Sequence, residues 1–218
     1  MRDSVKLTGM VLRATPSGEY DKRLIILTRE RGRITAFARG ARKPGNMLMA
    51  SSCPFAFGEF TLYEGRDAYN LQSADIKNYF SELSSDMEGA CYGSYFLEFA
   101  DYYSRENLDG TEILLLLYQS LRALLKPAIP NLLIQRIFEL RIMVINGEYT
   151  EHPEKQVSES ANYTWEYVIA SPIEKLYTFT VTPEVLKEFG KNVEKLKSHY
   201  VDKSFHSLEI LHMISNPY

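Results

Sequence analysis

A short stretch near the amino terminus gathers positive charge around one aromatic side chain. Residues 29–44 read RERGRITAFARGARKP, and six of these sixteen residues are Arg or Lys. Five of the six are Arg, whose guanidinium group can bind a phosphate through two parallel hydrogen bonds. Cations that follow the phosphates, together with a ring that stacks on a base, bind single-stranded nucleic acid. The stretch is therefore a candidate nucleic-acid surface.

The same stretch has the alternation of a β-strand. If residues 33–40 form a strand of a barrel, the small side chains of Ile34, Ala36 and Ala38 point inward. The outer face then carries Arg33, Thr35, Phe37 and Arg39. With its flanks and the preceding strand, the predicted surface comprises Lys22, Arg23, Arg29, Arg31, Arg33, Phe37, Arg39, Arg42 and Lys43. We interpret Phe37 as the stacking ring.

Two other interpretations of this surface stay open. The charges could simply keep a strand edge in solution, with Phe37 covered by another part of the chain. Alternatively, the surface could bind acidic partner proteins, which would make the chain an adaptor. The residues by themselves do not separate RNA from DNA.

The distribution of charge along the chain supports a polyanion-binding end. The net charge of the whole 218-residue chain is −3. Residues 1–45 contain eleven Lys or Arg and four Asp or Glu, whereas the remainder contains fourteen and twenty-four. A basic amino-terminal segment followed by an acidic remainder indicates that one end of the chain binds a polyanion.

Other residues that could support chemistry are less convincing. The spacing of the four His residues is not that of metal ligands. Glu19 and Asp21 are most simply explained as residues of a turn. The sequence has no phosphate-binding P-loop, so any dependence on ATP would belong to partners. We expect no cofactor, no metal and no enzymatic activity. Cys53 and Cys91 are expected to be free thiols. With no apolar leader or membrane span apparent, we expect a cytoplasmic protein.

The first eighty residues predict a small β-barrel. Apolar runs separated by turn residues predict five strands, at residues 5–14, 22–28, 33–40, 58–64 and 69–76. Gly32 is expected to adopt positive φ in the turn before the third strand. Five short strands in this length indicate a barrel of the OB type.

The remainder of the chain predicts mainly helices. Helical spacing is found from a capping box at Ser85 and Glu88 to Tyr103, from Asp109 to about Pro127, and over 130–146, 182–200 and 205–214. Between them, Tyr163, Trp165 and Tyr167 alternate with polar residues, which predicts a β-hairpin at about 160–182. We interpret these aromatic residues as a packed hairpin face in preference to a binding platform. The predicted fold class is α+β, with a barrel domain (1–80) and a helical domain (81–218).

The amino-terminal part resembles a known family. Residues 9–44, GMVLRATPSGEYDKRLIILTRERGRITAFARGARKP, resemble the amino-terminal domain of the bacterial recombination mediator RecO. Weaker matches follow at PFAFGEFTLY (54–63), YFLEF (95–99) and FELRIMVING (138–147). The resemblance implies an OB-fold barrel followed by a helical domain.

The resemblance also implies a function in DNA repair. RecO-like proteins bind single- and double-stranded DNA and anneal strands that are covered by single-strand-binding protein (SSB). They act in the RecF pathway with RecR to load the RecA recombinase. In this reading DNA would bind to the basic surface, and the acidic, apolar tail of SSB to a pocket in the helical domain. The basic residues that could serve that pocket are Arg122, Lys126, Arg136 and Arg141.

The chain departs from the family pattern in one respect. Many RecO proteins carry a four-cysteine zinc module after the segment that matches FELRIMVING, whereas this sequence has no Cys after Cys91. A structural zinc site needs four ligands placed close together, so we expect no zinc. The predicted aromatic hairpin would take the place of this module.

Overall fold

The computed structural model describes residues 4–215 and divides into two compact units. The barrel unit contains the chain up to Ser81 together with Leu97–Leu114. The helical unit contains Glu82–Phe96 and the chain from Leu115 onwards. The barrel strands end at Asn78, close to the predicted domain boundary.

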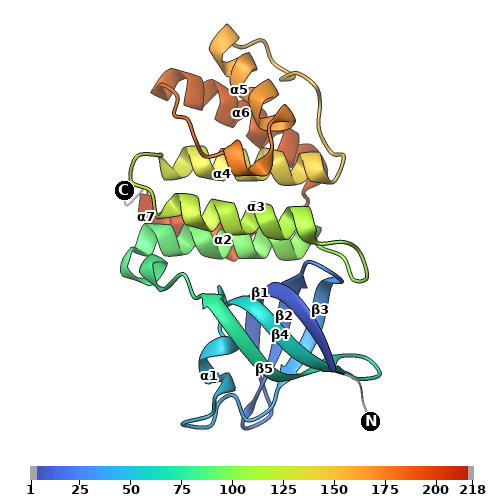
Figure 1. Ribbon diagram of the computed structural model, residues 1–218. Coiled ribbons are helices and arrows are strands. Elements are labelled where there is room, and N and C mark those ends of the chain that lie inside the picture. Colours follow the sequence, from blue (N-terminus) through green and yellow to red (C-terminus); the bar gives the residue numbers. More distant parts are fainter. Residues whose placement is uncertain (1–3, 216–218) are drawn as a thin grey trace. The chain divides into compact units, whose positions relative to one another are not determined.

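Five strands form a closed barrel in the order β1-β2-β3-β5-β4 (Figure 1). They are β1 (Ser4–Ser17), β2 (Asp21–Thr28), β3 (Gly32–Ala38), β4 (Phe57–Glu64) and β5 (Tyr69–Asn78). Neighbouring strands are antiparallel except for β3 and β5, which are parallel. All five correspond to predicted strands, and the prediction of an OB-type barrel is confirmed.

The barrel interior is filled by the side chains that the alternation predicts. Leu24 and Ile26 of β2 pack there with Ile34 and Ala36 of β3. The whole run Leu24–Leu27 is buried, as expected for a strand covered on both faces. On the outer face, Leu27 is close to the backbone of Gly110 in the barrel unit.

A short helix that the sequence analysis did not predict joins β3 to β4. Helix α1 (Leu48–Ser51) packs Leu48 against the barrel core. The ammonium group of Lys22 donates hydrogen bonds to the carbonyl oxygens of Met49 and Ser52, at 3.3 and 3.4 Å. These contacts fix the position of α1 relative to β2.

The next two helices begin close to their predicted starts. Helix α2 (Met87–Tyr103) is capped by Asp86, whose carboxylate accepts from the backbone N–H groups of Glu88 and Gly89. The predicted cap at Ser85 is therefore wrong by one residue. Helix α3 (Thr111–Leu124) begins after Asp109, which accepts from the N–H of Thr111 at 2.7 Å.

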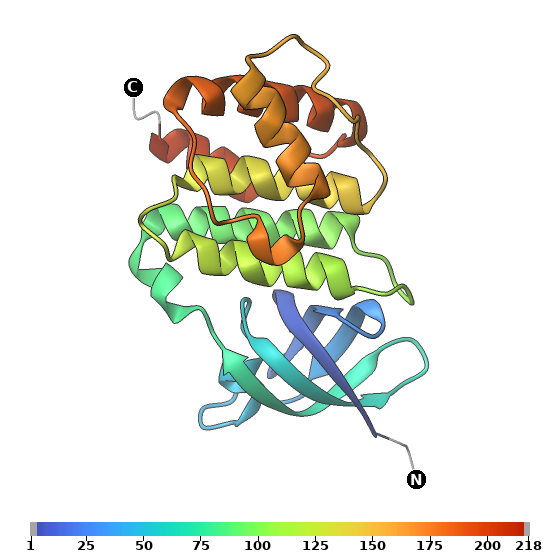
Figure 2. The ribbon, with the colours of Figure 1, turned by 45° about the horizontal axis from the view of Figure 1, so that its top comes forward.

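The helical unit contains four further helices that follow in the chain. They are α4 (Asn131–Ile145), α5 (Glu159–Ala170), α6 (Pro183–Tyr200) and α7 (His206–Ser215). Helices α4, α5 and α6 contact one another, and Figure 2 shows α5 lying across α6. The predicted helices at 130–146, 182–200 and 205–214 are confirmed. None of the helices within residues 4–215 combines the length and apolar character needed to cross a bilayer.

The predicted β-hairpin at 160–182 is wrong. Residues 159–170 form α5, and a short 3₁₀ turn (Ile173–Lys175) follows. Ser158 caps α5 by accepting from the N–H of Ala161, and the buried residues Ala161, Trp165 and Val168 have helical spacing. The alternating aromatic residues concealed this spacing, because Tyr163 lies on the exposed face while Trp165 lies in the core.

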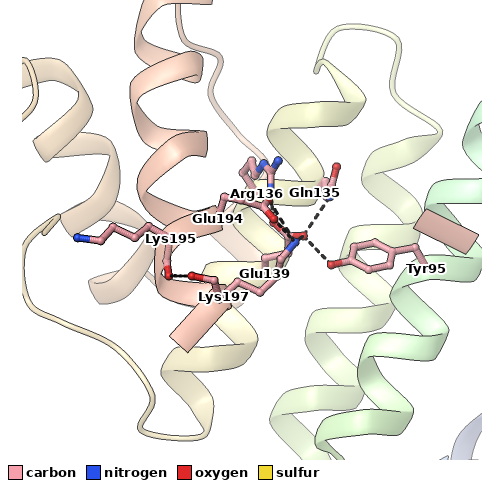
Figure 3. Close-up of polar contacts among 8 residues, drawn as sticks. Tyr95, Gln135, Arg136, Glu139, Glu194, Lys195 and Lys197 are labelled. Carbon is pink, nitrogen blue, oxygen red and sulfur yellow. Dashed lines mark hydrogen bonds and ion pairs between the residues drawn. The ribbon is translucent and has the colours of Figure 1, made fainter. Parts of the chain in front are cut away.

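A cluster of charged side chains is buried where α2, α4 and α6 meet (Figure 3). Glu139 of α4 is fully buried and accepts hydrogen bonds from Tyr95, Gln135, Arg136 and Lys197 at 2.5 to 3.0 Å. Burial alone would raise the pKa of Glu139, but the two cations and the hydrogen bonds outweigh it and lower the pKa to about 2. The carboxylate therefore stays ionised inside the helical unit.

The first prediction concerns this carboxylate. Replacing Glu139 with Gln leaves Arg136 and Lys197 without their buried counter-charge, so we expect the free energy of unfolding to fall by about 3 kcal/mol at pH 7. The pKa is 4.5 in the unfolded chain and about 2 in the fold. This stabilisation is therefore present above pH 4.5 and is lost as the pH falls towards 2.

Denaturation monitored by the fluorescence of Trp165, which packs against Phe189 in the same unit, measures this stability. The exposed Glu174 provides a matched control, since Glu174→Gln should leave the unfolding free energy unchanged. Equal stability of the Glu139→Gln variant and the wild type at pH 7 would contradict the prediction.

Candidate nucleic-acid interface

The alternation predicted for the basic strand is confirmed. In β3, Ile34, Ala36 and Ala38 are buried, with exposed fractions of 5% or less. Arg33, Thr35 and Phe37 are half-buried on the outer face. The structure nevertheless gives the two ends of this face different surroundings.

Cations at the Arg33 end of the strand are paired with carboxylates. Asp101, near the end of α2, lies 3.2 Å from a guanidinium nitrogen of Arg33 and 3.3 Å from one of Arg13. Arg31 is paired with Glu64 at 2.9 Å and also donates to the hydroxyl of Tyr69. These arginines contribute less charge to a ligand than the sequence suggests, because each already has an acidic partner.

Arg29 is paired in a similar way. Its guanidinium group lies 2.9 Å from the carboxylate of the neighbouring Glu30. Its backbone carbonyl accepts from the N–H of Gly110 at 3.0 Å. The same α2–α3 connection provides Arg105, whose carbonyl accepts from the N–H of Arg33 at 3.0 Å. The β2–β3 turn is thus held by the chain that follows α2.

The other end of the strand is open. In the strand register, Phe37 of β3 lies between Arg23 of β2 and Asn70 of β5. Arg39 is exposed, and its Nε donates to the amide oxygen of Asn70 at 3.3 Å. The ring of Phe37 is therefore bordered by two exposed guanidinium groups and a neutral amide.

The loop after β3 adds two more cations. Arg42 donates to the carbonyl oxygens of Gly18 and Glu19, at 3.2 and 3.1 Å. The ammonium group of Lys43 lies 4.7 Å from the centre of the Tyr20 ring, which is a cation–π contact. We call Arg23, Phe37, Arg39, Arg42 and Lys43 the open basic surface. Within residues 4–215, none of its four cations forms an ion pair with a carboxylate.

The cations of the predicted surface therefore fall into two groups, those that have other partners and those of the open basic surface. Arg29, Arg31 and Arg33 have carboxylate partners, and Lys22 is turned towards α1. The sequence analysis did not identify Asp101 or Asn70 as neighbours of this strand. No local signal marks them, because both come next to β3 only through long-range packing.

The four basic residues predicted to serve a pocket in the helical domain also differ in their surroundings. Arg136 belongs to the buried cluster around Glu139, and Arg141 donates to the carbonyl oxygens of Val168 and Ile169 at the end of α5. Arg122 and Lys126 are exposed. Only the latter two present their charge freely to solvent.

The two cysteines of the chain are not joined in a disulfide. Cys53 and Cys91 are free thiols, as predicted. Within residues 4–215, no group of three or more His, Cys, Asp or Glu side chains is placed to hold a metal ion.

Two family models match the chain. The model described as recombination protein O N terminal matches residues 1–80, and the one described as recombination protein O C terminal matches residues 84–152. Together they cover most of the chain, while the residues from 153 onwards, including α5 and α6, lie outside both.

Individual relatives agree with these matches. The DNA repair protein RecO of Acetivibrio thermocellus is 25% identical over 95% of this chain and 96% of its own length. Those of Alkaliphilus metalliredigens and Caldicellulosiruptor bescii are 34% and 33% identical over 66% and 67% of the chain. The last two matches span only 58% and 60% of those relatives.

The second prediction tests the support of the basic turn. Gly32 has φ of +62°, and an added Cβ would lie 2.3 Å from the carbonyl oxygen of Arg105. We expect Gly32→Ala to lower the free energy of unfolding by at least about 2 kcal/mol, because strain and a backbone clash add together. Chemical denaturation followed by circular dichroism measures this loss.

Gly18 offers a matched control for the clash. It also has φ of +62°, but no atom lies within 4 Å of its added Cβ. Gly18→Ala should therefore cost only the backbone strain, about 1 kcal/mol. If the two variants lost equal stability, the contact with the α2–α3 connection would be irrelevant to the turn.

Proposed function

The chain belongs to the RecO family of DNA repair proteins, and from this premise we propose that its barrel binds DNA through the open basic surface and anneals complementary strands. In this role the protein acts as a recombination mediator that binds and positions nucleic acid, with no bond-making chemistry. Both single- and double-stranded DNA are proposed ligands, since each presents phosphates to the same cations.

One observation carries the proposal. Arg23 and Arg39 flank the half-buried ring of Phe37 on the outer face of a barrel, and Arg42 and Lys43 follow in the next loop. Within residues 4–215 none of these four cations has an acidic partner. The guanidinium groups can track the phosphates, and the ring offers a face on which a base can stack. The neutral amide of Asn70 orients Arg39 without reducing its charge.

The alternative is an adaptor that binds acidic proteins through the same surface. Charge alone fits both ligands, but an acidic peptide has no base to stack on Phe37. A half-buried ring between two exposed arginines therefore favours nucleic acid. An adaptor would bind without accelerating annealing, so the two functions give different results in one assay.

We also propose that the protein loads RecA with RecR on DNA covered by SSB. For the SSB tail, Lys126 is the best-placed cation, because it lines a pocket of about 430 Å³ with Ile129 and Phe179. Exposed Arg122 lies four residues before it. An acidic, apolar tail would find both a charge and an apolar wall there, whereas Arg136 and Arg141 have other partners.

The third prediction tests the open basic surface. If its four cations each neutralise one phosphate, log K for single-stranded DNA should fall with log salt at a slope of about −3. The double variant Arg39→Ala, Arg42→Ala should flatten this slope by about 1.4 and slow the annealing of SSB-coated strands. Arg33→Ala should change the slope less than Arg39→Ala, because Arg33 is already paired with Asp101.

Fluorescence anisotropy at several salt concentrations and a strand-annealing assay provide the measurements. Arg66, whose side chain is 94% exposed in the β4–β5 turn, is the matched control. A double variant that anneals strands as fast as Arg66→Ala would rule out the open basic surface as the DNA site. Binding that stays tight while wild-type annealing is absent would favour the adaptor.

The fourth prediction isolates the ring. Phe37→Ala should weaken binding of single-stranded DNA by about 5- to 150-fold, because one stacked base is worth about 1–3 kcal/mol. The salt slope should stay unchanged, since no charge is lost. Phe37→Trp should retain binding.

The control for the ring is Tyr79→Ala, which removes an aromatic ring that is 44% exposed at the other end of β5 from Asn70. The Tyr79→Ala variant should bind single-stranded DNA with the same affinity as the wild type. If Phe37→Ala bound as tightly as this control, Phe37 would have no role as a stacking platform.

A further inference from the structure

The helical unit contains an aromatic groove that the DNA-binding function does not use. It has a volume of about 960 Å³ and lies between α5 and the segment that leads into α6. The rings of Tyr163, Tyr167 and Phe179 line it, together with Val181 and Val185. All of these residues lie beyond the part of the chain that the two family models match.

Three aromatic rings line the groove, two from α5 and one from the segment that leads into α6. The ring centres of Tyr163 and Tyr167 are 6.3 Å apart with an interplanar angle of 35°, and those of Tyr167 and Phe179 are 5.1 Å apart at 78°. Tyr163 is 66% exposed, although it is a large aromatic residue on a well-formed helix. The hydroxyl of Tyr167 donates to the carbonyl oxygen of Lys175, which fixes its ring. Exposed, ordered π faces attract cations.

The charge of the groove has a single sign. Among the described residues that line it, Glu159 and Glu166 are acidic and none is Lys or Arg. Oε1 of Glu166 accepts from the amide of Asn162 at 2.7 Å and lies 3.2 Å from Nδ1 of His152. These two contacts orient the carboxylate and use only one of its oxygens, so the other is available to a ligand.

We propose that the aromatic groove binds an arginine-bearing, apolar segment of a partner protein. The planar guanidinium group stacks on the tyrosine rings and pairs with Glu166, while neighbouring apolar side chains pack on Val181 and Val185. Arginine suits the site better than lysine, because it can stack and form the ion pair at once. An acidic peptide or a nucleic acid would be repelled by the two carboxylates.

The proposal is independent of DNA binding, because its residues belong to the helical unit and those of the open basic surface to the barrel unit. The two surfaces carry opposite charge and therefore select opposite ligands. The result of the peptide-binding experiment is therefore independent of the results of the DNA-binding assays.

The test uses the full chain and an acetylated, amidated peptide in which Arg alternates with Leu. Calorimetry and ¹H–¹⁵N correlation spectra at about 0.15 M salt should show binding, with shifts centred on Tyr163, Thr180 and Val185. A peptide with citrulline in place of Arg keeps the shape without the charge and should bind at least about fivefold more weakly. A peptide with Glu at the same positions should not shift the signals of Tyr163 and Val185, which line the groove but not the Lys126 pocket.

Two variants test the groove itself. Tyr163→Ala and Glu166→Gln should each weaken binding of the Arg peptide at least about fivefold. Tyr149→Ala and Glu174→Gln remove exposed residues of the same types outside the groove and should have no effect. The emission of Trp165, the only Trp of the sequence, reports whether each variant keeps the helical unit folded.

Absence of binding, equal binding of the citrulline peptide, or shifts centred outside the groove would each overturn the proposal. Equal losses in the groove variants and in their matched controls would overturn it as well. Charge-dependent binding that is lost only in Tyr163→Ala and Glu166→Gln would establish the groove as a site for a basic partner.

Discussion

The carboxylate of Asp101 determines which part of the basic strand can meet a ligand. It pairs with both Arg13 of β1 and Arg33 of β3, and its own side chain is only 14% exposed. Two guanidinium groups on one barrel face would repel each other without it. By pairing with both of them it ties the end of α2 to strands β1 and β3 and leaves the opposite end of β3 as the open part of the surface.

The same principle acts in the helical unit in a stronger form. Glu139 is fully buried, so its charge is tolerated only because Arg136 and Lys197 reach it together with two neutral donors. In both units a carboxylate forms ion pairs with cations that would otherwise be available to a ligand. Counting Lys and Arg along a sequence therefore overestimates the charge that a ligand meets.

Local patterns predicted much of the fold. Alternation placed Ile34 and Ala36 inside the barrel, and turn residues separated the five strands, because strand period and turn chemistry are short-range properties. The site was predicted less completely. Whether Arg33 or Arg39 is free depends on Asp101 and Asn70, which lie 68 and 31 residues away along the chain. Such partners are fixed by tertiary packing and leave no mark on the strand itself.

The wrong prediction of a hairpin at 160–182 has a physical cause that also explains the aromatic groove. Tyr163, Trp165 and Tyr167 alternate along the chain, but on a helix residues four apart share a face and residues two apart do not. Helical geometry therefore sends Trp165 into the core and places Tyr163 beside Tyr167, whose ring contacts that of Phe179. Had the segment been a strand, all three rings would have packed on one face. Because it is a helix, two rings remain available to a ligand, and the neighbouring Glu166 gives that ligand a required charge.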